Sequence, residues 1–132
     1  MGEGKGTVLV LDDEPSLRLL CRVNLELDGY RVLEAGSLEE ARAALDGEPV
    51  DVALLDVHVG PDRGLDLVGE LRALEPPAAV VVLSGTSEIT AETRATVDGV
   101  LGKPFALDEL LGTVSRVLLG ARGSQGTQGS HA

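Results

Sequence analysis

The sequence predicts an α/β fold in which a five-stranded parallel sheet is covered by helices on both faces. Three observations lead to this prediction. Short runs rich in valine and leucine alternate five times with segments of helical periodicity. Several of these runs are apolar at nearly every position, as expected of strands buried on both faces. The chain has 132 residues, which is the length of one domain.

The strands are expected at five short runs, most of which are followed by polar residues. The second run is half polar, which suits the edge of a sheet, and the fourth is the richest in β-branched residues. The fifth is short and contains Gly99 and Gly102. The predicted strands are 7–11, 30–35, 50–55, 78–83 and 97–102.

The helices are expected between these strands. Pro15 suits the first turn of a helix, and Ser37 with Glu40 forms a capping box for the next one. Ala106 stands at the expected N-cap of the last helix, where it offers no side-chain acceptor. The segment 87–97 has few apolar residues and three threonines, so we expect only a short, marginal helix there. The other predicted helices are 15–27, 37–45, 65–74 and 107–119.

The connections restrict the order of the strands, because parallel strands joined by helices use right-handed crossovers. By analogy with known sheets of this kind, we expect a flavodoxin-like (βα)5 three-layer sandwich of strand order 2-1-3-4-5. Three of the first six residues are glycine, and glycine, serine and glutamine are frequent after residue 119. We therefore expect a flexible N-terminus at 1–6, a folded domain at 7–119 and a disordered tail at 120–132.

The composition excludes several classes of function. A formal charge of −11 repels phosphate backbones and anionic lipids, so we expect no direct nucleic-acid or membrane binding. Tyr30 and Phe105 are the only aromatic residues, too few for stacking with bases. No signal peptide and no membrane-spanning run is present, so a cytoplasmic location is expected. Cys21 is the only cysteine, and its place among apolar residues predicts a core position.

Side chains that can bind a metal ion or take part in a reaction follow four of the predicted strands. Asp12 and Asp13 follow the first, Asp56 the third, Ser84 the fourth and Lys103 the fifth. Parallel strands bring these residues to one edge of the sheet. Three neighbouring carboxylates repel one another unless a cation neutralises them, and such oxygen ligands suit Mg²⁺ or Mn²⁺. With an ammonium and a hydroxyl nearby, a carboxylate can attack a phosphoryl group, so the sequence predicts phosphoryl transfer.

Once these residues are placed, residues 7–119 resemble the receiver domain of bacterial two-component response regulators, of the stand-alone, CheY-like kind. The resemblance rests on four motifs that follow the strands in the expected order. They are Leu-Asp-Asp-Glu-Pro at 11–15, Leu-Leu-Asp-Val at 54–57, Leu-Ser-Gly at 83–85 and Lys-Pro-Phe at 103–105.

The resemblance implies a role for each residue of the site. Asp56 is expected to be the phosphoacceptor, which takes its phosphoryl group from a histidine kinase or a histidine phosphotransfer protein. Ser84 and Lys103 are expected to bind that group, and the bond between Lys103 and Pro104 to be cis. The implied ligands of Mg²⁺ are Asp12, Asp13, Asp56 and the backbone carbonyl of His58. Such a domain catalyses only its own phosphorylation and dephosphorylation, so we do not expect an enzyme that acts on other substrates.

The sequence also departs from the family pattern. Val100 stands three positions before Lys103, where the family usually has a switch aromatic. The loop 58–64 lacks the usual Met-Pro pair and has Pro61 one position later. We interpret these departures as preserved phosphorylation chemistry with an altered output face, in which the segment 86–97 becomes ordered on phosphorylation.

Nothing after Leu119 is expected to fold into an output domain. Output is therefore expected through an unknown downstream protein, a phosphorylation-dependent homodimer or onward phosphoryl transfer, and a fragment of a larger protein stays an alternative. Val100 keeps open a second function, that of a phosphorylation-independent interaction module with the same fold. A small Mg²⁺-dependent phosphohydrolase of the haloacid-dehalogenase type is more remote, because the chain lacks an Asp-x-Asp motif on its first strand and a cap domain.

Overall fold

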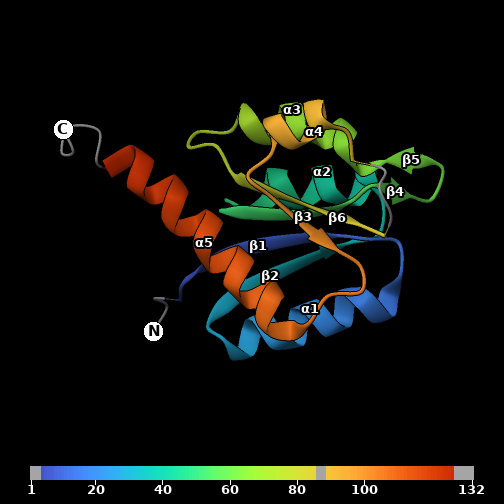
Figure 1. Cartoon of the computed structure of the whole chain (residues 1–132), viewed down its shortest axis with the longest axis horizontal. Coiled ribbons are helices and arrows are strands. Elements are labelled where there is room, and N and C mark those ends of the chain that lie inside the picture. Colours follow the sequence, from blue (N-terminus) through green and yellow to red (C-terminus); the bar gives the residue numbers. More distant parts are fainter. Residues whose placement is uncertain (1–3, 86–88, 127–132) are drawn as a thin grey trace.

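A parallel sheet forms the middle layer of the structure, a computed structural model that describes residues 4–85 and 89–126 (Figure 1). Its strands are β1 (Gly6–Leu11), β2 (Tyr30–Ala35), β3 (Val52–Asp56), β6 (Ala79–Ser84) and β7 (Gly99–Gly102). They lie in the order β2-β1-β3-β6-β7, and every pairing is parallel. Because β6 and β7 are the fourth and fifth strands of this sheet, the predicted flavodoxin-like order is confirmed.

A small hairpin follows β3 and was not predicted from the sequence. Its strands, β4 (His58–Val59) and β5 (Asp62–Arg63), pair antiparallel. Gly60 lies between them with φ of +61°, a backbone conformation that glycine adopts without strain. Two-residue strands are too short to show an alternating apolar pattern, so no local signal predicts them.

The helices form the two outer layers (Figure 1). One layer contains α1 (Pro15–Leu27) and α5 (Leu107–Gly126). The opposite layer contains α2 (Leu38–Gly47), the 3₁₀ helix η1 (Gly64–Leu67), α3 (Val68–Arg72) and α4 (Ala91–Thr96). Within the described part of the chain, no helix combines the length and apolar composition needed to cross a membrane.

Alternate residues of each strand pack against the two helical layers. On β1, Val8 and Val10 join the cluster under α1 and α5, whereas Leu9 and Leu11 join the cluster under α2 and α3. All four side chains are fully buried. The near-continuous apolar runs of the sequence are therefore explained by a sheet that is covered on both faces.

Several helix ends differ from the prediction. The helix expected at 65–74 begins as the 3₁₀ turn η1, and α3 ends at Arg72. The marginal helix expected within 87–97 is the six-residue α4, whose N-cap Thr90 accepts a hydrogen bond from the Thr93 N–H at 3.0 Å. The expected start of that helix, at 87, lies outside the described residues. Helix α5 continues to Gly126 instead of ending at Leu119.

The extension of α5 changes the predicted tail, because residues 120–126 are helical. Val117 and Leu118 are buried, and Ala121 packs against the same cluster, so tertiary contacts support the helix as far as Ala121. A glycine inside a helix costs only about 1 kcal/mol relative to alanine, and such contacts offset this cost. Residues 127–132 lie outside the described residues.

The caps predicted for the helices are observed in part. The Ser37 hydroxyl accepts the Glu40 N–H at 3.1 Å, as predicted. The Glu40 carboxylate, however, accepts the N–H of Gly36 and not that of Ser37. At the start of α5, the Glu109 carboxylate accepts the Ala106 N–H at 2.9 Å, so this end has a side-chain hydrogen bond although Ala106 offers none.

Cys21 lies in the core on the α1 side and is fully buried, as predicted. Burial raises the pKa of its thiol to about 11, the charge of Asp12 adds to the rise, and Lys103 opposes it. Because the thiolate is the reactive form, we expect iodoacetamide to leave the folded protein unmodified at mildly alkaline pH. Intact mass after incubation with and without urea checks this. Equal labelling of folded and unfolded protein would contradict it.

Candidate functional site

Charged residues from three strand ends meet at the carboxyl edge of the sheet. Asp12 directly follows β1, Asp56 ends β3, and Lys103 directly follows β7. The Lys103 ammonium lies 3.0 Å from Asp12 Oδ2 and 3.2 Å from Asp56 Oδ1. It therefore bridges two carboxylates that are far apart in the sequence, and the structure brings these three residues together as the sequence predicts.

Asp13 completes a group of three carboxylates. One oxygen from each of Asp12, Asp13 and Asp56 lies within 4.8 Å of the others. Asp12 is fully buried, Asp56 is half-buried and Asp13 is exposed. Three carboxylate oxygens with an open side for water are the donor set that Mg²⁺ or Mn²⁺ prefers, so these residues fit such a cation.

The turn between β1 and α1 is held by hydrogen bonds on several sides of Asp12. Its N–H donates to the Ala35 carbonyl at 3.1 Å, and its carboxylate accepts the Glu14 N–H at 2.9 Å. Its backbone carbonyl accepts a hydrogen bond of 2.7 Å from the Arg18 guanidinium. The directions of the Asp12 and Asp13 side chains are thus set by contacts with both β2 and α1.

The β4–β5 hairpin is tied to the same site. The Gly60 N–H, at its turn, donates to Asp13 Oδ2 at 2.8 Å. His58 lies in β4, two residues beyond Asp56, and its side chain is exposed. The place of His58 beside the site agrees with the sequence, and its role as a metal ligand through the backbone carbonyl stays a prediction.

Gly64 is a residue of the site that sequence reasoning did not single out. Its N–H donates to the Val57 carbonyl at 2.9 Å, which holds the chain against the end of β3. A Cβ atom added at Gly64 would lie 1.9 Å from the backbone carbonyl oxygen of Asp56. Only glycine fits this close approach. In the sequence, Gly64 is a single glycine at the end of a loop, and this pattern does not reveal that a backbone carbonyl lies against it.

Ser84 lies at the end of β6, beside Asp56. In the sheet register Asp56 is opposite Leu83, so Ser84 is the next residue along β6. Ser84 is buried, and its carbonyl accepts the Lys103 N–H at 2.7 Å. The cis peptide predicted between Lys103 and Pro104 is confirmed. Ser84 therefore lies at the correct edge of the sheet, whereas its contact with a phosphoryl group stays a prediction.

The electrostatics of the site follow from burial and from these close charges. Burial raises the pKa of Asp56, Asp12 adds to the rise, and Lys103 opposes it. Burial acts to lower the pKa of Lys103, but the hydrogen bond and charge of Asp12, together with Asp56, outweigh it and the pKa is raised. Lys103 therefore stays protonated near neutral pH, and a further cation would favour the ionised form of Asp56.

A model of the response regulator receiver domain matches residues 8–115 of the chain. The chain belongs to the response regulator receiver family. This match lies within the domain predicted at 7–119 and covers all four motifs. It leaves out only the first residues of β1 and the end of α5.

Relatives of this receiver domain include longer regulators. The chain is 36% identical to the transcriptional regulatory protein KdpE of Mycobacterium tuberculosis over 107 residues, which are 79% of this chain and 47% of KdpE. It is 28% identical to NtrX of Brucella abortus, with a TM-score of 0.81 over 91% of this chain and 28% of NtrX. The chain thus spans less than half of either relative.

A third relative has a modified aspartate. The crystal structure of a response regulator protein from Burkholderia pseudomallei contains a phosphorylated aspartic acid, a calcium ion and citrate. This protein is 25% identical to the present receiver domain, with a TM-score of 0.75 over 95% of this chain and 75% of that one.

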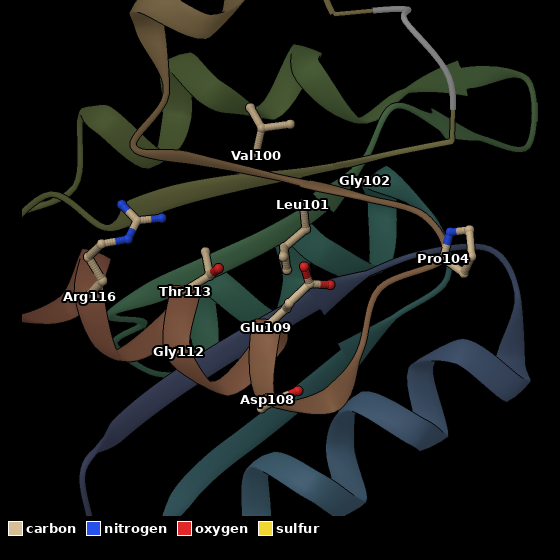
Figure 2. Close-up of a pocket in the computed structure, with 9 residues that line it drawn as sticks. All are labelled: Val100, Leu101, Gly102, Pro104, Asp108, Glu109, Gly112, Thr113 and Arg116. Atoms are coloured by element: carbon tan, nitrogen blue, oxygen red, sulfur yellow. The ribbon is translucent and has the colours of Figure 1, made fainter.

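The departure at Val100 lies outside the acidic cluster of the receiver domain. Val100 and Leu101 point to opposite sides of β7 (Figure 2). Leu101 is buried in the core, whereas Val100 is half-buried and lines a groove of about 460 Å³ between β7 and α5. Side chains of α5 line the groove opposite β7, among them Glu109 and Arg116 (Figure 2). The departure expected at Val100 therefore concerns a surface that none of Asp12, Asp13, Asp56 and Lys103 lines.

Proposed function

We propose that this receiver domain accepts a phosphoryl group on Asp56 from a histidine kinase or a histidine phosphotransfer protein. The observation that carries the proposal is the Lys103 ammonium, which bridges Asp56 and the buried Asp12 beside Asp13. A nucleophilic carboxylate, a fixed cation and two further carboxylates are the parts that phosphoryl transfer to an aspartate needs.

Each residue has a distinct part in the reaction. A carboxylate oxygen of Asp56 attacks the phosphorus, the bond from phosphorus to the donor nitrogen breaks, and an acyl phosphate remains on Asp56. Lys103 stabilises the negative charge on the transferred oxygens, and the Ser84 hydroxyl donates a hydrogen bond to one of them. Asp12, Asp13, Asp56 and the His58 carbonyl would hold Mg²⁺ or Mn²⁺. When bound, this ion neutralises charge on the phosphoryl group.

The comparisons support the same chemistry. The relative from Burkholderia pseudomallei has both a phosphorylated aspartic acid and a divalent cation in its structure. That observation supports an aspartate as the phosphoacceptor here, and the Lys103 ammonium at 3.2 Å favours Asp56, the carboxylate at the end of β3. KdpE, the relative named as a transcriptional regulatory protein, is more than twice as long as the segment that matches this chain. We therefore do not infer transcriptional control for this chain from KdpE.

The surface beside the site supports a protein as the phosphodonor. A hollow of about 350 Å³ next to Lys103 is lined by apolar residues, including Leu17, Leu20 and Phe105. Leu20 is exposed, as are three more apolar residues of α1, which are Leu19, Val23 and Leu27. Exposed apolar side chains that cluster in this way are typical of protein contacts.

The means of output stays a prediction. This holds for the downstream protein, for a phosphorylation-dependent homodimer and for ordering of the segment 86–97, which includes residues outside the described part.

Incubation with acetyl phosphate and Mg²⁺, followed by intact mass measurement, tests the proposal. We expect an adduct of one phosphoryl group, which does not form when EDTA replaces Mg²⁺ or when Asp56 is changed in Asp56→Asn. Asp66→Asn is the matched control, because Asp66 is exposed in η1 and is not part of the acidic cluster, so it should keep the adduct.

The same experiment separates the other two functions. Absence of any adduct in the unmodified chain would contradict the proposal and favour a phosphorylation-independent interaction module, the alternative that Val100 keeps open. Continuous release of phosphate from unrelated phosphate esters would favour a phosphohydrolase.

A further inference from the structure

The peptide unit between Asp12 and Asp13 connects two of the three clustered carboxylates. A peptide unit is planar, so a rotation of this unit moves the backbone of both residues and turns both side chains. Its carbonyl oxygen accepts a hydrogen bond of 2.7 Å from Nη1 of Arg18 on α1. Arg18 is therefore in direct contact with the group that sets the directions of Asp12 and Asp13.

Arg18 is itself held in a fixed place. Its Nε donates to Glu34 Oε1 on β2 at 3.2 Å, and its side chain is only 19% exposed. The guanidinium also covers Gly36, just beyond β2, where an added Cβ atom would lie 2.9 Å from Nη1. A planar guanidinium donates in two directions at once, here to the Asp12 carbonyl and to Glu34, whereas a lysine ammonium is a single point charge.

We propose that Arg18 is a positioning residue for the divalent cation. It holds the peptide between Asp12 and Asp13 so that both carboxylates face the place that Asp56 also faces. Arg18 donates to a backbone carbonyl of the site and to Glu34, and among the described residues it forms no hydrogen bond or ion pair with the three carboxylates themselves. The inference rests on the proposed function, because it concerns binding of the same cation.

Arg22 provides a comparison within the chain. It also pairs with Glu34, at 3.0 Å, and lies one helical turn further along α1. Its other ion pair is with Glu26, and no described contact joins it to the β1–α1 turn. A role in joining α1 to β2 is therefore shared by Arg18 and Arg22, whereas a role in positioning the Asp12 carbonyl belongs to Arg18.

The sign of the charge matters for the test. Loss of a positive charge near three carboxylates would by itself strengthen the binding of Mg²⁺, which opposes the effect expected from lost positioning. The variants therefore keep the charge. Arg18→Lys removes the guanidinium that donates to both the Asp12 carbonyl and Glu34. Gly36→Ala displaces the guanidinium while leaving Arg18 in the chain. Arg22→Lys is the matched control.

Binding of Mg²⁺ to the full chain is measured by calorimetry or by amide chemical shifts, and the unfolding midpoint is measured in EDTA. We expect the Kd for Mg²⁺ to rise about tenfold in Arg18→Lys and in Gly36→Ala, as is typical when a group that orients metal ligands is removed. We expect no change of Kd in Arg22→Lys. The midpoints of Arg18→Lys and Arg22→Lys in EDTA are expected to agree.

The outcomes distinguish this inference from the proposed function. If the unmodified chain binds no Mg²⁺, the proposed function fails. If the unmodified chain binds Mg²⁺ and Arg18→Lys and Gly36→Ala bind it with the same Kd, the role of Arg18 is overturned. The role is also overturned if the Kd for Mg²⁺ rises as much in Arg22→Lys as in Arg18→Lys.

Discussion

Replacement of Gly64 by alanine is expected to lower the free energy of unfolding by about 3 kcal/mol or more, at the upper end of what overpacking costs. The added Cβ would lie 1.9 Å from the carbonyl oxygen of Asp56. That oxygen belongs to the end of a buried strand, so it cannot rotate away as a side chain would. The chain is also held close at this point by the hydrogen bond from the Gly64 N–H to the Val57 carbonyl. The measurement is urea unfolding followed by circular dichroism.

Gly69→Ala is the matched control for this prediction. Gly69 lies in α3, and an added Cβ would meet nothing within 4 Å. Alanine is favoured over glycine in a helix by about 1 kcal/mol, so this variant is expected to be slightly more stable than the unmodified chain. Equal stability of the two variants would show that the close approach at Gly64 is not what determines the effect.

The strand order and the charged cluster were predictable because each leaves a local pattern. Strands such as β3 and β6 are buried on both faces and therefore read as continuous apolar runs. Asp12, Asp56 and Lys103 each follow such a run, and a parallel sheet carries all three to one edge. The four motifs then matched those of a known family, which the family model confirms over residues 8–115.

The supporting contacts of the site were not predictable, because they join segments with no common pattern. The hydrogen bond from Gly60 to Asp13 connects residues 47 positions apart in the sequence. The fit of Gly64 depends on a backbone oxygen opposite it, and the contact of Arg18 depends on a carbonyl in a turn. Apolar periodicity shows the core face of an element, but it does not show such close approaches between loops.

Exchange of Lys103 for methionine is expected to slow phosphorylation by acetyl phosphate about 10²–10³-fold, as loss of one group that stabilises transition-state charge commonly does. Methionine keeps most of the apolar stem and removes the ammonium that lies 3.2 Å from Asp56. Without it, the negative charge on the transferred oxygens has one fewer fixed positive charge nearby. The measurement is the rate at which the phosphoryl adduct appears at fixed Mg²⁺, followed by intact mass.

The same exchange is expected to destabilise the protein in EDTA by about 3 kcal/mol, because the fully buried Asp12 loses the cation 3.0 Å from its carboxylate. Mg²⁺ is expected to restore part of this stability, since its charge compensates the same carboxylates. The chain's other lysine is the control: Lys5 pairs with Asp28 at 3.2 Å on the surface, and such pairs contribute at most about 1 kcal/mol. A Lys103→Met variant that phosphorylates at the normal rate, or that is no less stable than Lys5→Met in EDTA, would contradict the assigned role of the ammonium.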